Sequence, residues 1–251
     1  MTFEPYSFLM IASIMLALVL SGSVKGVFGI GFPVVAMAIL PLFITPISAI
    51  TVIALPIVVT NIQQLFSEKE WRRIIIKYRY MALFMLLASF LSSQILTQIS
   101  VDLITAIIGF ALALFAIYSL FNFTLPITTH SSWQIIAGAS SGLLSGMTGI
   151  QSTAIIYFAS LDISRNEFVG AVGYIFLVGG LGLSIGLINN SLLNSSTVMI
   201  SLFGVLFSVV GFKLGSLLRP YIHSELFKKL LFLLMLIIGM KQIYQFFAYS
   251  I

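Results

Sequence analysis

The chain is organised as long apolar blocks separated by short polar connections. The blocks cover residues 6–30, 32–44, 47–66, 78–97 and 102–122, and then 133–150, 152–160, 167–188, 197–218 and 226–247. Most of them approach the ~20 residues that a helix needs to cross a bilayer. They show no alternation of apolar and polar positions, which predicts helices rather than the strands of a barrel. We therefore expect an all-α, polytopic membrane bundle in which residues 1–251 form a single membrane domain.

The two sets of blocks follow the same order of lengths: long, short, long, long, long. Residues 21–31 (SGSVKGVFGIG) also align with residues 141–151 (SGLLSGMTGIQ) at an offset of 120. The sequence thus predicts a first repeat over 6–122 and a second over 133–247. Each repeat has an odd number of net crossings, whether its short block crosses the membrane or folds back, so the second repeat is expected to be inverted. Inverted repeats with glycine-interrupted short helices are typical of transporters that bind substrate near the bilayer midplane.

Two helix starts are marked in the polar connections. Thr45 precedes Pro46, a pair typical of an N-cap followed by the first helical residue. Ser164 and Glu167 have the spacing of a capping box. Both signals predict that a new helix begins shortly after each short block.

Composition and charge support a membrane location. Hydrophobic residues make up 60% of the 251 residues and charged residues only 8%, whereas soluble domains carry about 25% charged residues. The positive-inside rule places the basic connections on the cytoplasmic side, with 123–132 also inside and both termini outside. The basic residues that define these connections are Lys69, Arg72, Arg73, Lys77, Arg79, Lys213, Arg219, Lys228 and Lys229. The net charge of +5 thus reflects topology, and we expect no nucleic-acid partner.

The aligned glycine motifs resemble those of the TauE/SafE family of sulfite exporter-like membrane proteins. The first copy is Gly22, Gly26, Gly29, Ile30 and Gly31, and the second is Gly142, Gly146, Gly149 and Ile150. The segment ALPIVVTNIQQ at 54–64 also resembles one branch of that family. The resemblance implies transport, mostly outward, of sulfite, organosulfonates and related small anions. Phe32 and Pro33 replace the family's further glycines, and Gln151 follows Ile150, which leaves substrate and direction open.

The glycines are expected to break two helices inside the membrane. Glycine adopts positive φ without strain, and a short helix that starts after such a break directs its free N–H groups and positive dipole end into the protein. We assign this role to Gly29, Gly31 and Gly149, which would form an anion site from backbone. The alternative is close helix packing through small residues, which we expect for the first two glycines of each motif.

Lys25 is a charged residue inside the first motif. A charge at the centre of a membrane helix costs roughly 2.5–3.5 kcal/mol, and the adjacent blocks contain no acidic residue to offset it. We therefore expect Lys25 to contact an anionic substrate. The alternative is that its side chain reaches the nearer membrane surface.

Further polar residues are candidates for the same site. Gln151, Ser152 and Thr153 stand where the second short helix should begin, where they could bind an oxyanion or only cap the helix. Asn61 and Gln64 share one helix face and could line an inner vestibule, with Tyr174 as a further lining residue.

The sequence favours a secondary transporter of a small anion and argues against an enzyme. The chain has no cysteine, and neither His130 nor His223 has neighbouring ligands at metal-site spacing, so no metal or cofactor is expected. An importer or channel for another anion remains an alternative, as does a membrane scaffold subunit. We expect a multi-pass protein of the bacterial inner membrane, in contact with lipid, and leave a homo-oligomer open.

Overall fold

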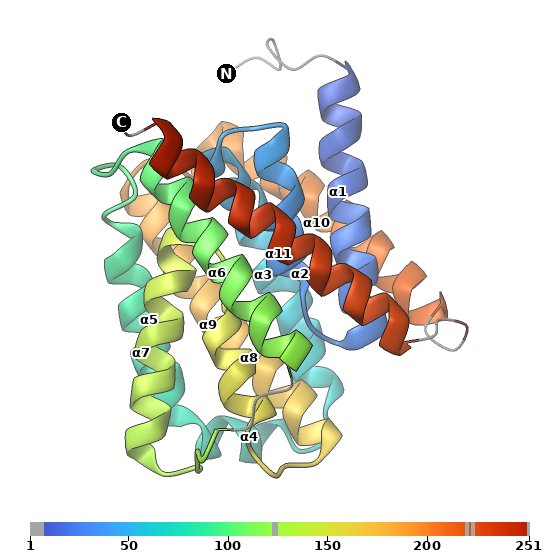
Figure 1. The fold of residues 1–251 in the computed structure, drawn as a ribbon. Coiled ribbons are helices and arrows are strands. Elements are labelled where there is room, and N and C mark those ends of the chain that lie inside the picture. Colours follow the sequence, from blue (N-terminus) through green and yellow to red (C-terminus); the bar gives the residue numbers. More distant parts are fainter. Residues whose placement is uncertain (1–7, 122–124, 219–220, 222–223, 250–251) are drawn as a thin grey trace.

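The computed structural model describes residues 8–121, 125–218, 221 and 224–249, and these residues form an all-α bundle without strands (Figure 1). Arg219 and His223 lie outside the described residues. The first half contains α1 (Phe8–Phe28), α2 (Phe32–Ile39), the 3-10 helix η1 (Leu40–Leu42), α3 (Pro46–Ser67), α4 (Trp71–Lys77), α5 (Arg79–Ser93) and α6 (Val101–Phe121). The second half contains α7 (Ser131–Thr148), α8 (Ser152–Ala159), α9 (Arg165–Asn189), α10 (Ser195–Leu218) and α11 (Ser224–Tyr249).

Six of these helices are long and apolar enough to cross a membrane: α1, α3, α6, α9, α10 and most of α11. The bent pair α4–α5, with a 71° angle between its two helices, would be a seventh span. The short helices α2 and α8 have eight residues each, too few to cross a bilayer alone. The all-helical membrane architecture expected from the sequence is therefore confirmed.

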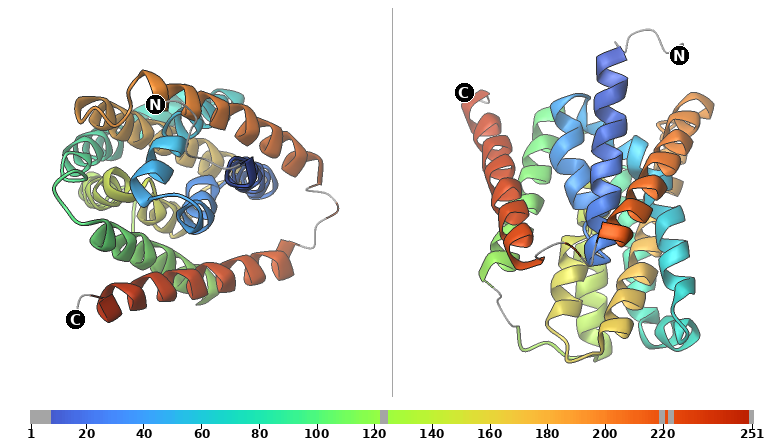
Figure 2. Two further views of the ribbon diagram at one scale, coloured as in Figure 1. Left: turned by 90° about the horizontal axis from the view of Figure 1, so that it is seen from above. Right: turned by 90° about the vertical axis from the view of Figure 1, so that its right-hand side faces the viewer.

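The short helices turn back toward the end of the bundle from which their predecessors came. We call the two ends of the bundle the Pro46 end, where α3 begins, and the Trp71 end, where α4 lies. Helix α1 runs from the Pro46 end toward the interior, and α2 returns to the Pro46 end, where α3 starts (Figures 1 and 2). Helix α7 starts at the Trp71 end, where Gln134 Nε2 donates to Lys77 O, and α8 returns there before α9 begins. Two helical hairpins thus enter the bundle from opposite ends.

Glycines join the hairpins to the other half of the chain. Helix α1 packs on α10, where a Cβ at Gly22 would lie 2.3 Å from Ser208 O and one at Gly26 would lie 2.2 Å from Phe212 O. Helix α7 packs on α5 in the same manner, and a Cβ at Gly146 would lie 2.2 Å from Ser89 O. The close packing expected for the first two glycines of each motif is confirmed.

Pro56 lies inside α3, where a proline removes the N–H that would bond the carbonyl four residues earlier. That carbonyl, Val52 O, accepts a hydrogen bond from Ser201 Oγ of α10 at 3.0 Å, and Ser201 Oγ also accepts from Leu55 N at 3.2 Å. In hydrocarbon, an unpaired backbone group costs several kcal/mol. Ser201 therefore allows a proline near the middle of a membrane helix.

The two expected helix starts are present. Thr45 caps α3 by accepting from Ser48 N, and Ser164 caps α9 by accepting from Glu167 N at 3.2 Å. The reciprocal half of the capping box does not form, because Glu167 is directed to the first half of the chain. Its Oε1 accepts from Tyr78 Oη at 2.7 Å and pairs with Lys77 Nζ. Glu167, in the first turn of α9, is therefore a partly buried ion-pair partner.

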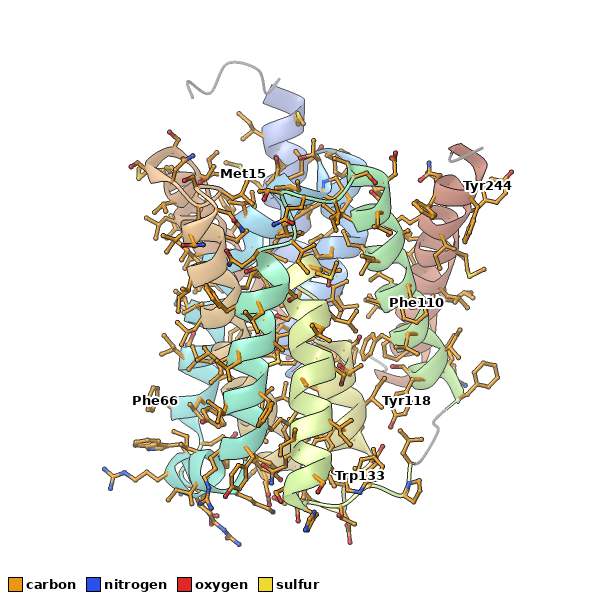
Figure 3. All side chains as sticks on the ribbon, turned by 90° about the vertical axis from the view of Figure 1, so that its left-hand side faces the viewer. Met15, Phe66, Phe110, Tyr118, Trp133 and Tyr244 are labelled. Carbon is orange, nitrogen blue, oxygen red and sulfur yellow. The ribbon has the colours of Figure 1, made fainter. Side chains whose placement is uncertain are left out.

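The bundle exposes apolar side chains around its circumference. Phe66 and Phe110 extend outward, while Trp133 lies at the Trp71 end and Tyr244 toward the other end (Figure 3). The interior is filled by aliphatic and aromatic residues from α2, α3, α5, α6, α8 and α9. This arrangement, apolar inside and outside, is that of a helical membrane protein.

Candidate functional site

The first helix break separates α1 from α2. Gly29 has φ 80° and Gly31 has φ 100°, both in the left-handed region. A Cβ at Gly29 would lie 3.5 Å from Val169 of α9, so the positive φ, and not lack of space, calls for glycine there. Gly31 is the N-cap of α2 and provides no side-chain cap. The first-turn N–H groups of α2 therefore point into the bundle without a capping side chain.

Lys25 lies in the last turn of α1, one turn before this break. Its side chain is only 2% exposed. The ammonium group donates to Asn61 Oδ1 at 2.6 Å and to Thr60 Oγ1 at 3.1 Å, both on α3. No acidic side chain pairs with it among the described residues. Lys25 is thus a buried cation solvated by two neutral oxygens, and the alternative in which it reaches the membrane surface is wrong.

The second helix break separates α7 from α8. Gly149 has φ 72°, and a Cβ there would lie 2.8 Å from Ile53 Cδ1 of α3. Gln151 occupies the N-cap position of α8 but makes no capping bond. Its Nε2 donates instead to Ser145 Oγ at 3.1 Å and to Phe176 O at 3.4 Å. The helix breaks predicted at Gly29, Gly31 and Gly149 are all present.

Three polar side chains at the second break have oxygens without a hydrogen-bond partner. These oxygens are Gln151 Oε1, Ser152 Oγ and Thr153 Oγ1, and all three are buried in the part of the chain described here. Ser152 and Thr153 therefore do not cap α8, which was the alternative to ligand binding. An unpartnered buried oxygen costs ~1–3 kcal/mol, a cost that hydrogen bonds to these three side chains would remove.

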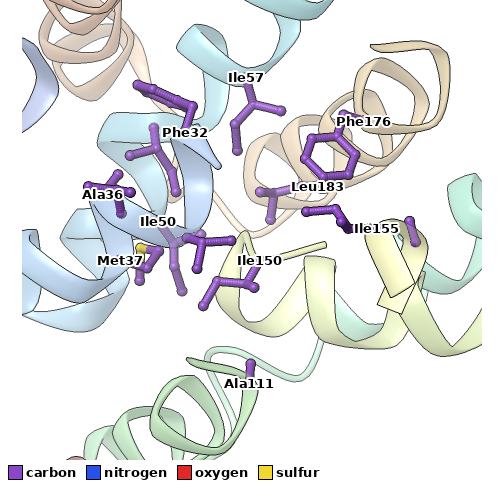
Figure 4. Close-up of a cluster of buried hydrophobic side chains, with 14 of the residues drawn as sticks. Phe32, Ala36, Met37, Ile50, Ile57, Ala111, Ile150, Ile155, Phe176 and Leu183 are labelled. Carbon is purple, nitrogen blue, oxygen red and sulfur yellow. The ribbon is translucent and has the colours of Figure 1, made fainter. Parts of the chain in front are cut away.

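Helix α3 connects the two breaks. Asn61 Nδ2 donates to Ile57 O at 2.7 Å, while Ile57 Cδ1 lies 4.0 Å from the place that a Cβ on Gly149 would take. An apolar residue follows the glycine at each break. Phe32 follows Gly31 and Ile150 follows Gly149, and both are fully buried. Figure 4 shows their side chains together with Ile50 and Ile57 between the short helices. Apolar packing thus fills the space between the two breaks in this conformation.

The comparison with protein families identifies the chain. Residues 14–242 match the family described as Sulfite exporter TauE/SafE. The chain belongs to the TauE/SafE family. No curated protein and no solved structure gives a match. TauE/SafE proteins are membrane transporters, so this chain is a multi-pass membrane protein of a transporter family.

The two breaks of this TauE/SafE chain differ in charge. The position that aligns with Lys25 at the offset of 120 is Ser145, whose hydroxyl accepts from Gln151. The first break therefore combines a helix N-terminus with a cation, and the second combines a helix N-terminus with neutral amide and hydroxyl groups. Lys25 and the hydroxyls of Ser152 and Thr153 can donate hydrogen bonds to an oxyanion, whereas Gln151 Nε2 already donates to Ser145 and Phe176 O. Neither set contains a carboxylate that would repel an oxyanion.

Two further residues of the TauE/SafE chain, Gln64 and Tyr174, were predicted to line the site, and only Gln64 lies beside a helix break. Gln64 Nε2 donates to Val169 O at 2.8 Å, beside the first break, and Gln64 Oε1 has no partner in the described chain. Tyr174 is half-buried against the apolar core, and no described contact brings it to Lys25 or Gln151. Sequence reasoning missed Thr60. Its position four residues after Pro56 and directly before Asn61 was the available signal, because Thr60 Oγ1 donates to Pro56 O at 2.7 Å and is left with acceptor capacity for Lys25.

Proposed function

We propose that this chain is a secondary transporter that exports a small sulfur-containing anion, sulfite or an organosulfonate. The substrate would bind between the two helix breaks, with Lys25 as its positive contact and the hydroxyls of Ser152 and Thr153 as neutral donors. Gln151 would line the site beside them, and its Nε2 would have to turn from Ser145 and Phe176 O to donate to the anion. The single observation that supports the proposal is the environment of Lys25. A buried cation that has no carboxylate partner among the described residues, beside a broken membrane helix, is the kind of site that an anion completes.

The two hairpins support the view that the halves are inverted repeats. They enter from opposite ends, and equivalent seams join α1 to α10 and α7 to α5. In such transporters the substrate site lies near the midplane between the repeats and opens alternately to either side. The apolar packing between the breaks (Figure 4) would then belong to a conformation closed around an empty site.

The driving force for export would be the membrane potential. An inside-negative potential of 100 mV favours outward movement of one negative charge by about 2.3 kcal/mol. A uniporter would therefore suffice to move the anion outward. We place the protein in the bacterial inner membrane, where such a potential exists.

The test is anion efflux from liposomes that contain the purified chain. Vesicles loaded with sulfite, an organosulfonate, sulfate or a small carboxylate are given an inside-negative potential, and the external anion is measured over time. We expect saturable efflux of a sulfur-containing anion that other anions of the same class inhibit. Efflux without saturation would indicate a channel. No efflux, together with a co-purifying protein, would indicate a scaffold subunit and refute the proposal.

A matched pair of variants tests the site itself. Lys25→Met removes the buried charge, whereas Lys213→Met removes an exposed charge from α10 and changes the net charge equally. We expect Lys25→Met to abolish saturable efflux and Lys213→Met to leave it unchanged. Thr153→Val should weaken transport without loss of stability, because its hydroxyl has no partner in the structure.

A further inference from the structure

A pocket at the Pro46 end is separate from the helix breaks. It lies between the start of α6 and the end of α11 and has a volume of about 290 Å³. Residues of η1 and the start of α3 close its third side. The polar groups in its lining are Asp102, Thr105, Lys241, Gln242 and Gln245.

The pocket lies beside the close contact between α6 and α11. The two helices are antiparallel and meet at Gly109 and Gly239, where a Cβ on Gly239 would lie 2.6 Å from Gly109 O. Asp102 precedes Gly109 by seven residues, which is about two helical turns or ~10 Å. Gln242 links the contact to the pocket, because it lines the pocket and its Cβ would lie 2.8 Å from a Cβ on Gly109.

The pocket is lined by two side chains of opposite charge, Asp102 and Lys241. Neither forms an ion pair with any residue in the described parts of the chain. Gln242 is only 4% exposed, and its Oε1 has no hydrogen-bond partner there. A ligand with one positive and one negative group would satisfy these three side chains.

The surroundings of the pocket favour a lipid over a soluble zwitterion. Helix α11 lies along the outer edge of the bundle beside α6 (Figure 2). Its residues Leu230, Leu234 and Ile237 are all exposed and, at a spacing of four, three and four, lie on the same helix face as Lys241. This apolar stripe leads from the pocket toward the middle of the bilayer, where acyl chains would lie.

We propose that this pocket binds the phosphoethanolamine headgroup of a phospholipid. The phosphate would pair with Lys241, and the primary ammonium would donate hydrogen bonds to Asp102 and to the amide oxygen of Gln242. A choline headgroup carries a positive charge but has no N–H to donate, and a glycerol headgroup has no positive charge. A volume near 290 Å³ holds a headgroup, while the acyl chains remain outside in the bilayer. The proposal is independent of the transport function.

The experiment measures lipid binding to the purified full-length chain. Delipidated protein in detergent is titrated with phosphatidylethanolamine, phosphatidylcholine or phosphatidylglycerol, and bound lipid is counted by native mass spectrometry. We expect phosphatidylethanolamine to bind about tenfold more tightly than the other two lipids, which corresponds to ~1.4 kcal/mol. Equal binding of phosphatidylethanolamine and phosphatidylcholine would overturn the proposal.

Two variants test which group of the lipid headgroup each charged side chain binds. Asp102→Asn should remove the preference for phosphatidylethanolamine over phosphatidylcholine, and Lys241→Gln should weaken both lipids by a similar factor. Lys213→Gln is the matched control. Lys213 lies on α10 and does not line the pocket, so this variant should bind the lipids as the wild type does. Because Asp102 and Lys241 are both exposed, the variants are expected to fold. An unchanged preference in Asp102→Asn would refute the assignment.

A soluble competitor distinguishes the source of the headgroup. Free phosphoethanolamine should displace the lipid only at far higher concentration, since it lacks contact with the apolar stripe. If free phosphoethanolamine bound as tightly as the lipid, the pocket would be a site for a soluble zwitterion and the lipid assignment would be wrong. Lys25→Met should leave lipid binding unchanged, so failure of the transport proposal does not affect this test.

Discussion

Replacement of Lys25 by methionine removes the buried charge while keeping an unbranched, apolar side chain. A charge at the centre of the membrane costs ~2.5–3.5 kcal/mol. The two hydrogen bonds to Thr60 and Asn61 offset this cost, because a bond from a charged group contributes ~1.5–3 kcal/mol. The two effects oppose each other. We therefore expect the unliganded variant to lose no more than about 3 kcal/mol of stability.

The effect on the liganded protein should be larger than the effect on the fold. An anion at 100 times its Kd adds ~2.7 kcal/mol to the stability of the wild type. Loss of one partner from a buried, hydrogen-bonded charge pair costs ~2–5 kcal/mol of binding free energy. If Lys25→Met loses about 2.7 kcal/mol, its Kd rises about 100-fold. The same anion concentration then equals the new Kd and adds only ~0.4 kcal/mol.

The assay is thermal unfolding of the purified protein with and without each anion. Sulfite, thiosulfate, sulfate, a sulfonate, a small carboxylate and chloride form the panel, and Lys213→Met is the control of equal charge. One sulfur-containing anion should raise the melting temperature of the wild type and of the control, but hardly that of Lys25→Met. If that anion stabilises Lys25→Met as much as the wild type, Lys25 is not the substrate contact and the reasoning is refuted.

Two further substitutions test the helix break and the interface between the halves. Gly149→Ala should destabilise the protein by ~1–2 kcal/mol, because alanine is strained at the positive φ of this position. The new methyl group would also lie 2.8 Å from Ile53 Cδ1. Adding Ile53→Val removes that atom and should recover the part of the stability that this clash costs. Both effects are measurable by unfolding in mixed micelles, and an unchanged stability of Gly149→Ala would contradict the assigned backbone geometry. Glu167→Gln should lose ~1.5–3 kcal/mol of stability, the value of hydrogen bonds to a charged group. Glu70 forms an exposed ion pair with Arg73, 3.0 Å from Arg73 Nη1 to Glu70 Oε2, and Glu70→Gln should lose less than ~1 kcal/mol. The same loss in both variants would show that the Glu167 ion pair does not stabilise the interface.

The fold class could be predicted because the relevant signals are local in the sequence. The lengths of the apolar blocks predict membrane helices, and Gly29, Gly31 and Gly149 predict the breaks, since positive φ depends on the residue itself. Caps at Thr45 and Ser164 are also local. By contrast, whether the short helices cross or return depends on contacts between distant helices. The sequence left both alternatives open for that reason.

The site could be predicted only in part. Lys25 and Asn61 were both candidates, but nothing in the sequence indicated that one side chain would bond the other across 36 positions. Thr60 was missed because a threonine in an apolar helix usually bonds its own backbone, as it also does here. The sequence marks Glu167 only by its capping spacing, and its pairing with Lys77 and Tyr78 arises only when α9 packs on α4 and α5.

The seam between α1 and α10 has a consequence for synthesis of the chain. Gly22 and its contact Ser208 are separated by 186 positions (208 − 22), which a ribosome covers in roughly 10 to 40 seconds at ~5–20 residues per second. During that interval α1 is already made, but its glycine face has only lipid or the insertion machinery as a neighbour. Lys25 can meet Thr60 and Asn61 much earlier, because they follow it by only 35 and 36 positions. The buried cation therefore finds its hydrogen bonds during translation, whereas the closest helix contact of α1 forms only once nearly the whole chain has left the ribosome.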